Sequence, residues 1–183
     1  MSLVDILLIG IGLSMDAAAV SMTNGMVYKN LNRITYISMP LFFGVFQMMM
    51  PVAGYYAGGI FAELITRYSG IVIFIILGII GGKMIKEGIG DLNKKDVCPV
   101  KTMTFGVLLL QAVATSIDAF AVGIGFSAAG VGVWMPSVLI GMITFIIVVA
   151  AILIGRKFGD MLGCRAEILG GAILVIIGIK ALI

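Results

Sequence analysis

The chain has 183 residues, of which 61% are hydrophobic and 11% are charged, and its mean hydropathy is +1.21. A soluble domain is closer to half apolar and a quarter charged, and a fold of this length could not hide so much apolar surface from water. The formal net charge of +3 is too small an excess to indicate a nucleic acid as partner. The composition therefore predicts an all-α integral membrane protein whose solvent is the lipid bilayer.

Six apolar stretches are long enough to cross a bilayer, by the rule of about 20 residues per helical span. They cover roughly residues 3–27, 35–58, 69–88, 103–127, 133–155 and 166–183. Lipid offers no hydrogen-bond partners to backbone groups, so each stretch is expected to be a helix. The predicted fold is therefore a bundle of six transmembrane helices.

The connections between these stretches alternate in charge. The second connection has only Arg67, and the fourth, SAAGVGVWMPS, has no charged residue. Because cytoplasmic connections are enriched in Lys and Arg, the odd-numbered connections are expected to be cytoplasmic and both termini to lie outside. Trp134 then fits an anchor at the outer interface. The basic residues of the odd-numbered connections are Lys29, Arg33, Lys86, Lys94, Lys95, Lys101, Arg156, Lys157 and Arg165.

The first and fourth stretches carry similar motifs, SMDAAAV and SIDAFAV, in which Asp16 aligns with Asp118 at a shift of 102 residues. The stretches that follow them align at a shift of 97 residues. The chain is therefore divided into a first three-helix repeat (1–90), a cytoplasmic linker (91–102) and a second three-helix repeat (103–183). Matched polar or small residues are Ser14 with Ser116, Gly44 with Gly141, Gln47 with Thr144 and Lys83 with Lys180.

Three spans per repeat is an odd number, so the second repeat must enter the membrane with the opposite direction. Inverted repeats of this kind recur in secondary transporters, which bind their substrates near the midplane at the repeat interface. The pattern therefore predicts two inverted three-helix repeats with a binding site between them.

The two aspartates are the candidate site. Asp16 lies 13 residues after Leu3 and Asp118 lies 13 residues after Phe105. Both are thus near the middle of the bilayer, where a carboxylate costs about 2.5–3.5 kcal/mol on insertion scales. Two nearby carboxylates repel each other unless a cation lies between them. A shared divalent metal would neutralise both. A protonated, purely structural aspartate is the alternative interpretation.

Further ligands to such a metal would come from oxygen atoms, since the chain has no histidine and its two cysteines lie outside the spans. Carboxylate, amide and carbonyl oxygens suit Mg²⁺, Ca²⁺ or Mn²⁺. The candidates beside the aspartates are Gln47, its repeat counterpart Thr144, and Asn24. Backbone carbonyls could complete the set.

Other residues have weaker candidate roles. Glu87 and Glu167 lie at cytoplasmic span ends, either as carriers of protons or metal into the protein or as partners of nearby basic residues. Small residues four apart allow close helix packing, and they predict that the two aspartate-bearing spans pack against each other. The packing candidates are Ala17, Ser21, Gly25, Ala121 and Gly125.

The segments SMDAAAV, FFGVFQMMMP, GGKMIKEG, TSIDAFAVGIG and AEILGG together resemble the MntP-type manganese efflux pumps of bacteria, in the lysine exporter superfamily. The resemblance covers nearly the whole chain. It implies six spans, the cytoplasmic (inner) membrane, export of Mn²⁺, and essential roles for Asp16 and Asp118. Ala18 departs from the family pattern, which often has Phe there, as Phe120 does in the second motif.

The predicted function is a secondary transporter that exports Mn²⁺ by alternating access, with proton coupling, and that has Mn²⁺ as substrate, no cofactor and no required protein partner. A passive divalent-cation channel is one alternative. An exporter of another small solute, such as an amino acid, is a second alternative, but such a substrate would need a donor for its carboxylate and no basic residue lies mid-span. An enzyme is disfavoured because the chain lacks histidine, a CxxC motif and a nucleophile–base pair.

Overall fold

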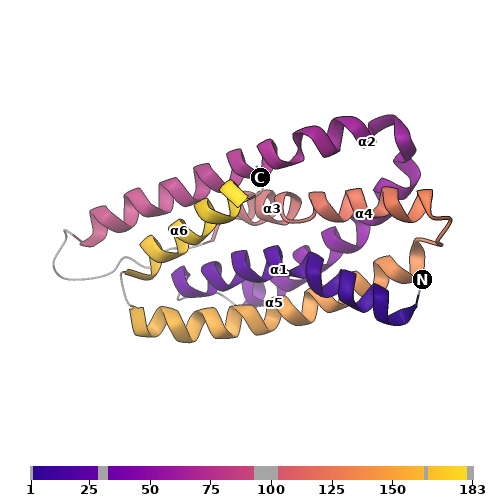
Figure 1. Cartoon of the computed structure of the whole chain (residues 1–183). Coiled ribbons are helices and arrows are strands. Elements are labelled where there is room, and N and C mark those ends of the chain that lie inside the picture. Colours follow the sequence, from indigo (N-terminus) through magenta and orange to yellow (C-terminus); the bar gives the residue numbers. More distant parts are fainter. Residues whose placement is uncertain (1, 29–32, 93–102, 163–164, 181–183) are drawn as a thin grey trace.

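The computed structural model describes residues 2–28, 33–92, 103–162 and 165–180. These residues form helices α1 (Leu3–Val27), α2 (Arg33–Leu92), α3 (Phe105–Ala114), α4 (Ile117–Ala128), α5 (Trp134–Leu162) and α6 (Arg165–Lys180). The described part of the chain contains no strand, which confirms the all-α class. The helices run lengthwise beside one another in an elongated bundle (Figure 1).

Four segments of the described chain are long and apolar enough to cross a membrane. They are Leu3–Val27, Tyr36–Ala57, Phe105–Ala128 and Trp134–Gly159, close to four of the predicted spans. α6 has 16 described helical residues, which is shorter than the roughly 20 residues that a full span requires. The protein is therefore a multi-pass membrane protein. Most of the linker predicted at 91–102 lies outside the described residues.

α2 was predicted as two separate spans but is one helix of 60 residues. Figure 1 shows that it bends sharply and doubles back, so that its two halves run in opposite directions. Its first half packs against α4 and α5, where Gly54 lies against Phe120 and Gly44 against Gly141. Its second half packs against α6 through Gly81. The helix thus supplies two antiparallel elements without an extended loop between them.

The fourth predicted span is broken in its middle. α3 ends at Ala114 and α4 begins at Ile117, with Thr115 and Ser116 in a turn between them. The Thr115 hydroxyl donates to the Gln111 carbonyl at 2.9 Å, and the Ser116 hydroxyl donates to the Ala112 carbonyl at 2.7 Å. Ser and Thr hydroxyls that bond to the preceding turn compete with the helical ladder and bend helices. A new helix therefore starts immediately before Asp118.

The small residues bring together different helices from those that the sequence predicted. α1 packs mainly against α5 and α6, whereas α4 packs mainly against α2. Gly25 lies against the Ile152 backbone of α5, and Gly123 lies against the Pro51 carbonyl of α2. The two aspartate-bearing spans meet through Asn24 and Gln111, but their main packing partners are other helices. The spacing of small residues allows close approach without specifying the partner helix.

The buried core divides into two apolar clusters. The larger contains Val20, Met39, Phe43 and Leu108 with their neighbours, and the smaller is centred on Leu13, Ala119, Phe126, Val133 and Ile140. Large apolar side chains also cover the outer surface of the bundle, where they would contact lipid in a membrane.

Candidate functional site

Asp16 lies in the middle of α1, between the residues that belong to the two apolar clusters. Leu13, one turn before it, is part of the smaller cluster, and Val20, one turn after it, is part of the larger. The Asp16 side chain is half-buried. Because Asp16 lies mid-helix, its own helix offers no terminus that would stabilise the charge.

Asp118 has a different local setting, because it lies in the first turn of α4. The Ala119 amide donates a hydrogen bond to Asp118 Oδ1 at 2.8 Å. The N-terminus of a helix carries partial positive charge and stabilises a carboxylate. The break at Thr115–Ser116 therefore places a helix N-terminus where the negative charge is needed, as in the discontinuous helices of transporters.

The two carboxylates come from different helices, but Leu13, one turn before Asp16, and Ala119, next to Asp118, belong to the same apolar cluster. The structure thus brings together the two aspartates that the sequence paired, although their helices are held mainly by α5 and α2.

Lys180 is a charged residue that the sequence analysis did not connect with the aspartates. Gly170 of α6 packs against Thr23 and Val27 near the end of α1. From there α6 runs back along the bundle and ends near its middle (Figure 1). Lys180 is its last residue, and the positive charge of its ammonium group acts on Asp16. Lys180 lies at the end of α6 and is exposed, so it is not a buried basic residue in the middle of a span.

Gln47 is buried between α2 and α1, with a relative exposure of 1%. Its Nε2 donates to the Leu13 carbonyl at 2.9 Å, one helical turn from Asp16. Its Oε1 is also buried and has no hydrogen-bond partner among the described residues. Buried amide oxygens are nearly always paired, so an unpaired one about one turn from Asp16 is suited to receive a cation.

Thr144, the repeat counterpart of Gln47, is fully buried on α5. Its hydroxyl donates to the Ile140 carbonyl of its own helix at 2.9 Å. The oxygen therefore keeps lone pairs that could accept a hydrogen bond or contact a cation.

Asn24 lies two turns beyond Asp16 and is fully buried. Its Oδ1 accepts a hydrogen bond from Gln111 Nε2 at 3.3 Å, and its Nδ2 donates to Gln111 Oε1 at 2.8 Å. Asn24, predicted as a ligand, thus has its oxygen engaged by another amide. The sequence analysis missed Gln111, although an amide inside the apolar run LLLQAVA is the same signal that identified Gln47.

Glu87 and Glu167 lie together where the second half of α2 meets α6. Glu87 forms an ion pair with Lys83 at 3.8 Å, with both side chains well exposed. Glu167 is buried in the first turn of α6, beside Gly88. Both acids therefore belong to the α2–α6 contact.

The packing candidates separate into two groups. Ala17, Ser21 and Gly25 are buried on α1. Ala121 and Gly125 are exposed on α4, and a Cβ at Gly125 would meet no atom within 4 Å. Gly123, which the sequence analysis did not select, makes the close contact of α4.

The chemistry open to this site follows from its donor atoms. Across the part of the chain that the structure describes, no three His, Cys, Asp or Glu residues cluster as they do in a closed metal cage. Two carboxylates with amide, hydroxyl or carbonyl oxygens can hold a hard divalent cation that keeps part of its hydration. Such an incomplete shell favours release of the ion over permanent binding.

The bundle, its lipid-facing surface and the mid-membrane charged residues define a multi-pass helical membrane transport protein. A family profile described as "Putative manganese efflux pump" matches residues 30–182. The chain belongs to this family, whose members are transporters rather than enzymes.

Curated relatives extend the similarity over the whole chain, including α1. A protein of Ruminiclostridium cellulolyticum is 48% identical over 180 residues, covering 98% of this chain and 95% of its own length. One from Methanobrevibacter smithii is 43% identical over 182 residues, covering 100% of this chain and 97% of its own. Both are named "Putative manganese efflux pump MntP". No solved structure matches the chain.

Proposed function

We propose that this protein exports Mn²⁺ from the cytoplasm as a secondary transporter, through a site formed by Asp16 and Asp118. The observation that carries the proposal is the pair of carboxylates in the apolar middle of the bundle, one of them at a helix break. The names of the relatives support Mn²⁺ as the substrate. Gln47 Oε1 is the proposed neutral ligand, because it is buried, unpaired and held one turn from Asp16.

Mn²⁺ resolves the repulsion between the two carboxylates that would otherwise oppose folding in lipid. When the site is empty, the positive charge of Lys180 offsets part of the negative charge at Asp16. The empty transporter could therefore change back to its inward-facing state with less unbalanced charge in the apolar interior.

Alternating access is proposed to arise from two inverted repeats. The aligned residues Gly44 and Gly141 lie against each other's backbone carbonyls. α1 packs on α5, while α4, its counterpart in the second repeat, packs on the first half of α2, the counterpart of α5. Such exchanged contacts are expected from a pseudo-twofold arrangement and support a rocking motion of one repeat against the other.

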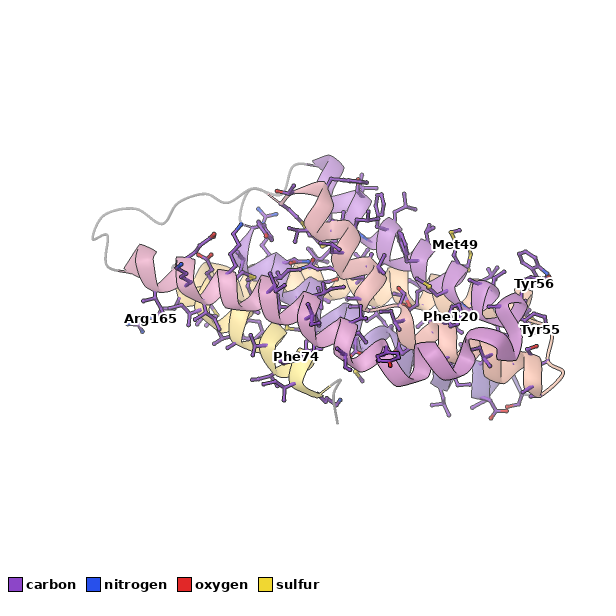
Figure 2. All side chains as sticks on the ribbon, turned by 90° about the horizontal axis from the view of Figure 1, so that it is seen from above. Met49, Tyr55, Tyr56, Phe74, Phe120 and Arg165 are labelled. Atoms are coloured by element: carbon purple, nitrogen blue, oxygen red, sulfur yellow. The ribbon has the colours of Figure 1, made fainter. Side chains whose placement is uncertain are left out.

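The proposed location is the cytoplasmic membrane, with both termini outside. Tyr55 and Tyr56 lie at one end of the bundle and Arg165 at the other (Figure 2), as expected for an outer aromatic belt and a basic cytoplasmic end. Cys98 and Cys164, which lie outside the described residues, belong to basic connections.

We therefore expect a membrane-impermeant maleimide added outside intact cells to leave both cysteines unlabelled. Permeabilised cells serve as the positive control. Rapid labelling of either cysteine in intact cells would show that the chain has the opposite orientation.

Measurement of Mn²⁺ flux into inverted membrane vesicles distinguishes a proton-coupled pump from a passive channel. A proton-coupled exporter should accumulate Mn²⁺ above the outside concentration when the vesicle lumen is acid, with saturable kinetics. Collapse of the pH gradient by a protonophore should stop accumulation. Equilibration that never exceeds the outside concentration and is unaffected by the protonophore would indicate a passive channel instead.

A further inference from the structure

A reciprocal amide bridge joins α1 to α3. Asn24 and Gln111 exchange two hydrogen bonds, of 2.8 and 3.3 Å, and their side chains are 0% and 1% exposed. Asn24 Nδ2 also lies 3.9 Å from Met39 Sδ. Both amides are thus fully enclosed, and each satisfies the other.

The bridge lies between the aspartates and one end of the bundle. Asn24 is eight residues beyond Asp16, about 12 Å along α1 at 1.5 Å per residue. Gln111 is seven residues before Asp118, or about 10 Å along the chain of helices α3 and α4. Both displacements point to the end where α1 finishes and α3 begins, which is the proposed cytoplasmic end.

The two bridged helices are held mainly by other neighbours. α1 packs on α5 and α6, while α3 packs on α2. The amides therefore connect two parts of the bundle that could separate without dismantling either of these packing surfaces. Met39, which lies beside Asn24, and Leu108 and Ala112, which flank Gln111 on α3, belong to the larger apolar cluster, so the separated amides would face apolar side chains.

The equivalent positions at the opposite end have different chemistry. At the shift of 102 that aligns the aspartates, Asn24 corresponds to Phe126 and Gln111 to Ile9. Phe126 is buried in the smaller apolar cluster, and Ile9 packs against the same cluster. The same positions therefore carry an amide bridge at one end and apolar side chains at the other.

We propose that the Asn24–Gln111 bridge is the inner closure of the transport path, which separates the aspartates from the cytoplasm while it is intact. The closure opens when the two amides part, and their oxygens then face the hydrated ion on its way to Asp16. This inference rests on the proposed function for the location of the site, but it gives Asn24 the role of a closure in place of a ligand.

Accessibility of a reporter cysteine tests this closure directly. The reporter is Ala19→Cys, one turn from Asp16, in a chain whose Cys98 and Cys164 are replaced by serine. An impermeant maleimide is applied to sealed vesicles, once from the cytoplasmic face and once from the outer face. Asn24→Leu and Gln111→Leu each leave one buried amide unpaired, so each should raise the labelling rate from the cytoplasmic face about tenfold.

Two further variants sharpen the result. The double variant Asn24→Leu/Gln111→Leu replaces both amides by apolar groups, as at the opposite end, and should restore slow labelling, because no unpaired amide is left. Phe126→Ala should raise labelling from the outer face and leave the cytoplasmic rate unchanged. Unchanged rates in both single variants, or an increase confined to the outer face, would overturn the proposal.

Mn²⁺ binding to the same purified variants separates this inference from the proposed function. Asn24→Leu should bind Mn²⁺ as the parent chain does, whereas Asp16→Asn should lose Mn²⁺ and keep the parental labelling rates. Loss of Mn²⁺ binding in both Asn24→Leu and the double variant would show that Asn24 is a ligand and would refute the closure. Retained binding in Asp16→Asn would refute the proposed site while leaving the labelling result valid.

Discussion

Replacing either aspartate by asparagine is expected to abolish Mn²⁺ export while the protein still inserts at a normal level. Asn keeps the size of Asp but removes the charge that attracts the ion, so packing should survive and binding should not. Mn²⁺ tolerance of cells that express Asp16→Asn or Asp118→Asn should fall to that of cells without the protein. Membrane abundance, measured by immunoblot, is the control.

A comparison of the two single variants with the double variant distinguishes a shared site from two structural carboxyl groups. If both aspartates hold one ion, the double variant should be hardly worse than either single variant, since the first substitution already removes the site. A structural, protonated aspartate predicts the reverse, because a neutral amide is tolerated in lipid and transport should continue. If cells with either single variant at normal abundance tolerated Mn²⁺ as well as cells with the parent chain, the shared-site hypothesis would be contradicted.

Gly123→Ala is expected to cause a large loss of stability. A Cβ at Gly123 would overlap the Pro51 backbone of α2, and a backbone contact cannot be relieved by turning a side chain. Overpacking of this kind costs about 1–3 kcal/mol and sometimes more. The substitution should also displace α4, and with it Asp118, so that transport falls together with thermal stability in detergent.

Gly125→Ala on the same helix is the matched control. A Cβ there meets no atom within 4 Å, and alanine favours a helix over glycine by about 1 kcal/mol. Its midpoint of thermal unfolding should equal or exceed that of the parent chain. Equal midpoints for the Gly123 and Gly125 variants would contradict the packing of α4 on Pro51.

The long apolar runs made the class of the fold and four spans predictable, because hydrophobic length alone determines what can cross a bilayer. The break at Thr115–Ser116 was not predictable in this way. The two hydroxyls lie within an unbroken apolar run, and only their hydrogen bonds to the preceding turn interrupt the helix. The continuous helix α2 was missed for the complementary reason, since the stretch with Arg67 between two apolar runs was interpreted as a connection.

The aspartate pair was predictable because a carboxylate in an apolar span needs a compensating partner. The residues around the pair were harder to predict, since contacts between distant segments depend on how the helices pack. Asn24, for example, meets Gln111 because α3 lies beside α1 at that level. Small-residue spacing, which is local, could not identify α5 and α2 as the packing partners.

Direct Mn²⁺ binding to the purified protein tests the paired-aspartate site most simply. Electron paramagnetic resonance of free Mn²⁺ in a titration should show one bound ion per parent chain. Asp16→Asn and Asp118→Asn should each bind none at the same concentration, with Gly125→Ala as the binding-competent control. One ion bound with parental affinity by either aspartate variant would contradict a site that both carboxylates share.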